Sequence, residues 1–309
     1  MKSKTIKKVL KIKINDWLKS ITDESVRNLA GKNTIVTGGA IASMLLKEKV
    51  NDFDVYFSNK ETALAVARYY VRIFNEKHGE SAEVLDGAVY SKDQYINSGF
   101  AGAANLTPDR IKIGIKSKGV SGEQQDEPHE GIIEHLDDID PKALDVETEK
   151  EKYQPVYLSS NAITLTNRIQ IIIRFYGNAD ELHENYDFVH CTNYYEHSNS
   201  NLVLRPQALE AILAKELKYV GSKYPLCSII RTRKFIARGF SINAGQYLKM
   251  CFQLSNLDLS DINILEDQLI GVDSAYFGML IEGLKTKLKD EPEYKIEQDY
   301  ITTIIDRIF

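Results

Sequence analysis

The chain has 309 residues, of which 43% are hydrophobic and 27% charged, a composition typical of a soluble globular protein with about two domains. Its net charge of −5 excludes a general attraction to nucleic acid, so any such contact needs a local basic patch. No apolar run reaches the roughly 20 residues of a membrane span, and the basic N-terminus lacks the apolar region of a secretory signal. Three scattered cysteines fit a reducing cytosol, so we expect a cytoplasmic protein without a membrane partner.

The first eighty residues alternate between helical and extended patterns. Residues 5–31 have the apolar spacing of one or two amphipathic helices, with Asp23 placed to cap the second. We interpret the lysine-rich face of this segment as the solvated side of a packed helix, with contact to a polyanion as the alternative. The pattern then predicts a strand at 34–37, a helix at 40–49, a strand at 52–57 and a helix at 61–78.

The middle of the chain is extended and its last third is helical. Residues 110–116 alternate as a strand with one wet face, and residues 119–152 are interpreted as an acidic, exposed and partly disordered insertion. Further strands are predicted at 155–165, 168–175 and 186–189, the second of them central because it is almost continuously apolar, with a helical turn at 180–185. The later helices are expected at 206–220, 225–238, 244–254, 261–269, 275–289 and from 297. The predicted fold class is α+β, with a mixed-sheet domain at 1–200 and an all-helical domain at 201–309.

The strongest functional pattern lies in residues 34–58, TIVTGGAIASMLLKEKVNDFDVYFS. Side chains alternate along a strand, so Asp52 and Asp54 are expected on one face, about 6–7 Å apart, with Phe53 and Val55 on the other. Carboxylate oxygens suit Mg²⁺, which binds through one or two carboxylates plus substrate phosphates. The Gly38-Gly39 turn at a helix N-terminus adds bare backbone N–H groups for phosphate. The alternative is a solvated strand face beside an ordinary turn.

This pattern also carries a resemblance to a known superfamily. Gly38-Gly39, twelve further residues and then Asp52-Phe53-Asp54-Val55 resemble the signature of the DNA polymerase β-type nucleotidyltransferases. The surrounding sequence is most similar to the head domain of tRNA nucleotidyltransferases and poly(A) polymerases, and to phage-encoded nucleotidyltransferase-like proteins. The resemblance covers about residues 30–60 and 160–240. It implies a nucleotidyltransferase-type mixed sheet, two Mg²⁺ ions and an NTP substrate.

The resemblance suggests further site residues. Superfamily enzymes commonly use a third carboxylate on a neighbouring strand, for which Asp187 is our candidate. Gln170 or Arg174 could instead face the site from the preceding strand. Arg231 and Lys234 lie on one basic helical face and match positions that meet the incoming nucleotide in tRNA nucleotidyltransferases. The alternative for that face is ordinary solvation.

The implied reaction moves a nucleoside monophosphate from an NTP to an acceptor hydroxyl, such as an RNA 3′ end, and releases pyrophosphate. The implied roles are metal binding for Asp52, Asp54 and Asp187, phosphate binding for Gly38, Gly39 and Ser43, and charge neutralisation for Arg231 and Lys234. Two alternatives remain: a catalytically inactive nucleotide- or RNA-binding phage protein, and a toxin-like nucleotidyltransferase that modifies tRNA or protein. For a phage-encoded chain, the expected location is the host cytoplasm.

The departures from the family pattern are also informative. Ala42-Ser43 replaces the charged pair of the family's Gly-Gly-x-Val-Arg-Asp, and Asn185-Tyr186 stands where an Arg-Arg pair is usual. The residues that read cytosine and adenine edges are missing, so templateless CCA addition is not implied. His183, His190, Cys191 and His197 match no structural zinc spacing, and we interpret them as packed side chains.

Overall fold

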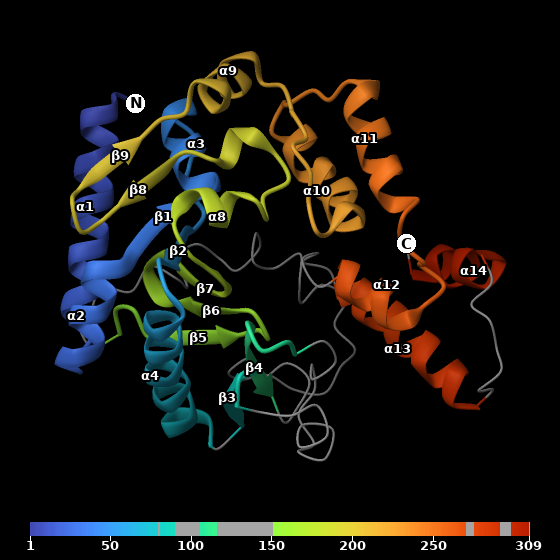
Figure 1. The fold of residues 1–309 in the computed structure, drawn as a ribbon, viewed down its shortest axis with the longest axis horizontal. Coiled ribbons are helices and arrows are strands. Elements are labelled where there is room, and N and C mark those ends of the chain that lie inside the picture. Colours follow the sequence, from blue (N-terminus) through green and yellow to red (C-terminus); the bar gives the residue numbers. More distant parts are fainter. Residues whose placement is uncertain (80, 90–105, 116–150, 270–274, 291–297, 309) are drawn as a thin grey trace. The chain divides into compact units, whose positions relative to one another are not determined.

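The computed structural model describes residues 1–79, 81–89, 106–115, 151–269, 275–290 and 298–308. They divide into two compact units: the described part of the first ends at Ala214, and the described part of the second begins at Lys215 (Figure 1). The sequence analysis placed the boundary between the two domains at residues 200 and 201, fourteen residues earlier. The predicted α+β class is confirmed, because a mixed sheet is followed by a helical region. All but the last two residues of the predicted insertion at 119–152 lie outside the described residues.

The first unit is organised around a seven-stranded sheet in the order β5-β6-β7-β2-β1-β8-β9. Its strands are β1 Thr34–Thr37, β2 Phe53–Phe57, β5 Pro155–Leu158, β6 Ala162–Leu165, β7 Ile169–Tyr176, β8 Tyr194–Glu196 and β9 Asn201–Val203. Only β2 and β7 pair in parallel within this sheet; all its other neighbouring strands are antiparallel. β7 lies between β6 and β2, so the prediction of a central strand is confirmed. Strands β3 Ala82–Asp86 and β4 Ile111–Ile115 form a separate antiparallel pair.

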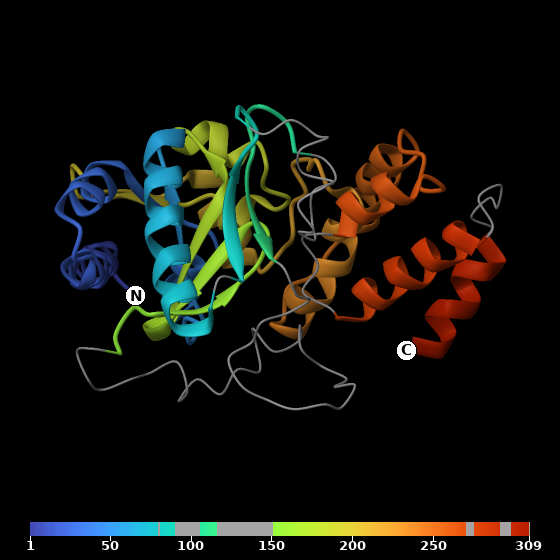
Figure 2. The ribbon, with the colours of Figure 1, turned by 90° about the horizontal axis from the view of Figure 1, so that it is seen from below.

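The main core lies on one face of this sheet. Phe53, Val55 and Phe57 all project into it, as their alternation predicts. Helices α1 Ser3–Ser20, α2 Glu24–Asn33 and α4 Lys60–His78 contribute to the same core, and Figure 2 shows α4 lying alongside the strands. On the opposite face, Ile35 and Tyr56 form a smaller cluster with Leu182 of α8 Ala179–His183. The residues that alternate with the core positions of β2 therefore belong to a second, thinner layer.

The N-terminal helices follow the sequence pattern with two exceptions. Asp23 caps α2 by accepting hydrogen bonds from the backbone N–H groups of Ser25 and Val26, as predicted. Trp17 is buried and its Nε1 donates to the Tyr70 hydroxyl at 2.8 Å. The apolar residues Val9 and Ile12 of α1 lie outside the core, because 36% and 57% of their surfaces are exposed.

The second unit contains five described helices: α10 Pro225–Ala237, α11 Ala244–Leu254, α12 Ile262–Leu269, α13 Ala275–Asp290 and α14 Gln298–Ile308. The first and last residues of these helices differ from the predicted ones by one residue at most; for α14 only the start was predicted. Their core is built on Leu265, Leu269, Leu280, Ile281 and Leu284. In the described parts of the chain, no helix is both long and apolar enough to cross a membrane.

Several predicted elements differ from the structure. Residues 155–165 form the hairpin β5–β6 instead of one strand, because Ser159 turns the chain and bonds back to Ala162. The helix α9 Pro206–Ala214 ends six residues before its predicted end, where Lys215 has a φ of 48°. The predicted wet face of β4 is wrong at Lys112, which is only 3% exposed and pairs with Leu85 of β3. Strands β3, β8 and β9 were not predicted because each is short or lacks a clear alternation.

Candidate active site

The turn between β1 and α3 Gly39–Leu46 lies directly against Asp54. Gly38 has φ 96° and ψ −152°, a conformation that is essentially restricted to glycine. A Cβ atom at Gly38 would stand 2.5 Å from the Asp54 Oδ2 atom, closer than nonbonded atoms approach. The missing side chain therefore makes room for this carboxylate beside the start of α3. The structure brings the two halves of the predicted motif together.

Asp54 also begins a row of polar side chains across the sheet. It pairs with Gln170 of β7 in the parallel register, and Gln170 pairs with Thr164 of β6. Thr164 in turn pairs with Tyr157 of β5. Paired residues on neighbouring strands project from the same face, so the four side chains share the face that carries Asp54. This supports the alternative that Gln170 faces the site from the preceding strand.

The other predicted residues of the motif are placed differently. Asp52 lies one residue before β2, partly exposed, so it precedes the strand that holds Asp54. Ser43 is buried one turn after Gly39 on α3. A Cβ atom at Gly39 would meet nothing within 4 Å, so open space adjoins the backbone at this point. The first turn of α3 thus offers an approach to backbone N–H groups, which suits an anion.

Asp187 does not lie on a strand as predicted. It occupies a bend before the short 3₁₀ helix η2 Val189–Cys191, because the chain turns back after α8 through a helical turn. The side chain is 4% exposed and its Oδ1 accepts a hydrogen bond from the Phe188 N–H at 2.9 Å. The same segment packs on the glycine turn, since the Gly38 N–H donates to the Cys191 carbonyl at 3.1 Å.

A metal ion is implied by the superfamily resemblance and can be tested against these placements. Among the residues that the structure describes, no set of three or more His, Cys, Asp and Glu side chains could hold a metal ion. Asp52, Asp54 and Asp187 are all described and are not grouped as such a set in this structure, so the role of Asp187 as a third ligand stays a prediction. The remaining donors, Asp52 and Asp54 beside a glycine turn, fit a Mg²⁺ ion held by one or two carboxylates and completed by substrate phosphates.

Behind Asp54 lies a buried polar network that the sequence-based reasoning missed. Thr37 Oγ1 lies 2.8 Å from the Nε2 atom of His183, 3.0 Å from the Asn193 carbonyl and 3.3 Å from the Cys191 carbonyl. Both carbonyls can only accept, so the Thr37 hydroxyl has three possible acceptors for its one proton, and its role towards His183 depends on the tautomer of the imidazole. The Nδ1 atom of His183 is buried without a hydrogen-bond partner. Burial favours the neutral imidazole over the charged form.

Tyr186 links this network to Asp54. Its ring packs edge-on against His183 at 5.0 Å between centroids and lies 6.2 Å from the ring of Tyr56. Burial, followed by the neighbouring Tyr56 and the Asp54 carboxylate, raises the pKa of Tyr186 well above its ordinary value. From the sequence, Tyr186 was noted only because it stands, with Asn185, where tRNA nucleotidyltransferases usually have an Arg-Arg pair. The structure shows a neutral hydroxyl at that position instead of a positive charge.

The pKa of His183 gives a testable pH dependence. Burial first, and then Arg205, lower this pKa from 6.5 to about 4, although Asp180 opposes the shift. Because the unfolded chain binds the proton more readily, the stability that depends on neutral His183 is complete above pH 6.5 and is lost as the pH falls towards 4. We expect the difference in unfolding free energy between wild type and His183→Gln to shrink by about 2 kcal/mol from pH 7.5 to pH 5. Urea unfolding at both pH values measures it, and an unchanged difference would contradict the assignment.

The predicted basic helix belongs to the second unit. Arg231 and Lys234 are both exposed on α10, as the helical pattern predicts, and Arg238 follows the last helical residue. The helical placement of these side chains is thus confirmed. Their contact with a nucleotide stays a prediction.

The fold and this site define an α+β protein in which a strand carboxylate lies in the gap left by a glycine at the start of a helix. The chain belongs to the Gabija anti-defense 2 family, Gad2, whose family model matches residues 8–215. The match covers most of the chain and includes all of the site residues of the first unit. It ends at residue 215, one residue after Ala214, the last residue of that unit. Comparisons with curated proteins and with solved structures find no match.

Proposed function

We propose that this chain is a Mg²⁺-dependent nucleotidyltransferase, which moves a nucleoside monophosphate from an NTP to an acceptor hydroxyl and releases pyrophosphate. The observation that carries the proposal is the contact between Asp54 and the Gly38 turn. It brings a metal-binding type of carboxylate next to the open backbone of a helix N-terminus, where a triphosphate can be bound.

Each group near this contact has a role in the proposal. Asp52 and Asp54 hold Mg²⁺, which when bound supplies activation of the acceptor oxygen and stabilisation of the leaving pyrophosphate. The N–H groups after Gly39 bind the phosphates, and Gln170 beside Asp54 orients the substrate by hydrogen bonds. Arg231 and Lys234 neutralise phosphate charge as it develops. Asp187 has a supporting role, because its segment fixes Gly38 through the Cys191 carbonyl.

The family membership gives the activity a biological setting. The family is described as Gabija anti-defense. We therefore propose that a bacteriophage uses this transfer to counter the Gabija defence, with an RNA 3′ end or another hydroxyl-bearing molecule of the host cytoplasm as acceptor.

Thermal denaturation tests the nucleotide-binding step directly. NTP with Mg²⁺ should raise the melting temperature by a few degrees, because about tenfold excess over Kd stabilises the native state by about 1.4 kcal/mol. The same NTP with EDTA, and Mg²⁺ alone, should each give a much smaller change. Absence of any shift at millimolar NTP with either Mg²⁺ or Mn²⁺ would count against the proposal.

A second candidate is a catalytically inactive protein that binds a nucleotide or RNA. It is favoured by one observation, that Asp187 does not complete a three-carboxylate metal set with Asp52 and Asp54. Incubation with each α-labelled NTP, Mg²⁺ and total cellular RNA or protein separates the candidates. Label on RNA or on protein supports transfer and distinguishes an RNA-directed enzyme from a toxin-like protein modifier. Binding without any labelled product supports the inactive candidate.

A further inference from the structure

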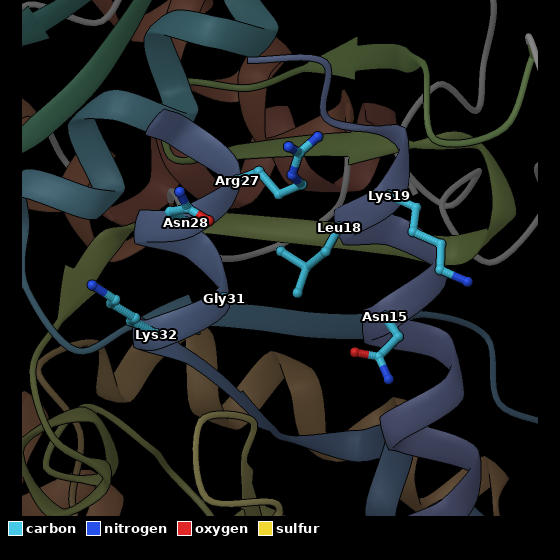
Figure 3. A pocket seen from close by; sticks show the side chains of 7 residues that line it. All are labelled: Asn15, Leu18, Lys19, Arg27, Asn28, Gly31 and Lys32. Atoms are coloured by element: carbon cyan, nitrogen blue, oxygen red, sulfur yellow. The ribbon is translucent and has the colours of Figure 1, made fainter. Parts of the chain in front are cut away.

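A shallow hollow of about 440 Å³ lies between α1 and α2. Neither Gly38 nor Asp54 is among the residues that line it. Figure 3 shows Leu18 at its centre, between the two helices, with the polar side chains around it. Gly31 faces Leu18 from α2, where a Cβ atom would reach Leu18 Cδ1 at 3.7 Å. The lining residues are Asn15, Leu18, Lys19, Arg27, Asn28, Gly31 and Lys32.

The charge of this hollow is entirely positive. Lys19, Arg27 and Lys32 line it, and none of its lining residues is acidic. Within the described part of the chain none of the three cations has a carboxylate partner; Arg27 Nη1 donates to the Ile21 carbonyl at 3.1 Å. Asn15 and Asn28 add amide donors between the charges. Cations beside neutral donors form the chemistry that binds phosphate oxygens.

Two of the three acidic residues in this segment are committed to other contacts. Asp23 caps α2 by accepting hydrogen bonds from the backbone N–H groups of Ser25 and Val26. A hydrogen bond from the Ser25 side chain, together with these backbone bonds, keeps the pKa of Asp23 below its usual value. Asp16 accepts a hydrogen bond from the Tyr153 hydroxyl at 2.9 Å. Neither carboxylate lines the hollow. The third acidic residue, Glu24, is exposed in the first turn of α2, one turn before Arg27, and does not line the hollow either. The lining therefore carries three positive charges and no negative charge.

The hollow continues into a basic stripe along α1. Positions 4, 8, 15 and 19 recur at the spacing of one helical face, so Lys4 and Lys8 lead along the helix to Asn15 and Lys19. Lys4, Lys8 and Lys19 are exposed. Residues 1–33 contain nine Lys and Arg against three Asp and Glu, in a chain whose net charge is −5. The positive charge is thus concentrated on these two helices.

We propose that the α1–α2 hollow and its stripe bind the phosphate backbone of a nucleic acid. A row of exposed cations along about 20 Å of helix matches an extended polyanion better than a compact anion. The lining offers no aromatic side chain for stacking on bases, and its one large apolar side chain, Leu18, is only 8% exposed and so is a poor anchor for a protein partner. Ile12 on the stripe is a single exposed apolar residue, which is ordinary for a protein surface. Binding should therefore be sequence-independent and strongly dependent on salt.

The test measures fluorescence anisotropy of labelled single-stranded RNA, single-stranded DNA and duplex DNA with the full chain, in EDTA and without NTP. These conditions separate the result from that of the proposed transfer. We expect binding of all three at low salt, and a roughly ten- to hundredfold weaker affinity for the variant Lys19→Gln/Arg27→Gln/Lys32→Gln. The slope of log K against log[salt] should fall in magnitude by about 2–3.

A second triple variant, Lys47→Gln/Lys77→Gln/Lys289→Gln, removes the same charge from exposed lysines outside the hollow and should bind almost as wild type. Circular dichroism and melting curves confirm that both variants are folded. Equal losses in the two triple variants would overturn the proposal, since they would show an effect of net charge only. Absence of binding by the wild type at low salt would also overturn it, as would displacement of RNA by poly-glutamate at the same charge concentration.

Discussion

The substitution Asp54→Asn should abolish nucleotidyl transfer while the chain remains folded. The amide is nearly isosteric with the carboxylate, so it fits the gap beside Gly38, but it lacks the negative charge that a Mg²⁺ ligand supplies. We expect transfer from α-labelled NTP to fall at least on the order of 10³-fold. Asp52→Asn should have a similar effect, because Mg²⁺ is held by both carboxylates in the proposed site.

Two comparisons make this result specific. Glu76→Gln removes an exposed carboxylate from α4 and should leave transfer unchanged. Asp187→Asn should retain substantial transfer, since Asp187 lies in the bend before η2 and not on a strand beside Asp54, and its segment supports the glycine turn. If Asp54→Asn unfolds the chain, the carboxylate is structural and the central assignment fails. Full activity in a folded Asp54→Asn variant would have the same consequence.

The second large effect is expected at Gly38, with Gly39 as its matched control. Alanine at Gly38 must adopt a backbone conformation that non-glycine residues avoid, and its Cβ would collide with Asp54 Oδ2. We expect Gly38→Ala to lower the unfolding free energy by about 3 kcal/mol, from backbone strain and the displaced carboxylate together. Gly39→Ala places its Cβ in open space at the start of α3 and should leave stability within about 0.5 kcal/mol of wild type.

Nucleotide binding completes this comparison. If phosphate approaches the backbone at Gly39, the added methyl group should weaken the NTP-dependent thermal shift although the fold is intact. Denaturant unfolding and thermal shift, measured on the same two variants, therefore separate the structural glycine from the binding glycine. Equal losses of unfolding free energy in Gly38→Ala and Gly39→Ala would contradict the special role of Gly38 beside Asp54.

The sequence predicted elements well where the hydrophobic period was long. The helices of the second unit, the strand at 34–37 and the start of the following helix follow from spacing, caps and glycine placement. That helix ends at Leu46, three residues before its predicted end, where Lys47 has a φ of 62°. The hairpin β5–β6 could not be separated from one long strand, because its turn at Ser159 lacks Gly, Pro or Asn-Gly. The segment after α8 was misassigned because Asp187-Phe188-Val189 alternates like a strand, whereas the capping box at Asn178 starts a helix that turns the chain back.

The site was predictable in part for the same reason. Gly38 and Asp54 lie sixteen residues apart, so local pattern was enough to connect them. Gln170 was identified only as an alternative, because its place beside Asp54 depends on a parallel register between distant strands. The contact between His183 and Thr37 could not be predicted from the sequence, because a hydrogen bond between residues 146 positions apart produces no pattern in the local sequence.

The parallel pairing of β2 with β7 also fixes when the site can form during synthesis. Asp54 and Gln170 are separated by more than a hundred residues, and closing that loop costs conformational entropy before the central contact is gained. At about 5–20 residues per second, several seconds of translation pass between the two strands. Until β7 emerges, β2 has an open edge and Asp54 lacks its neighbour on that side. A chain that stops before residue 169 would therefore carry both aspartates of the motif and still lack the assembled site.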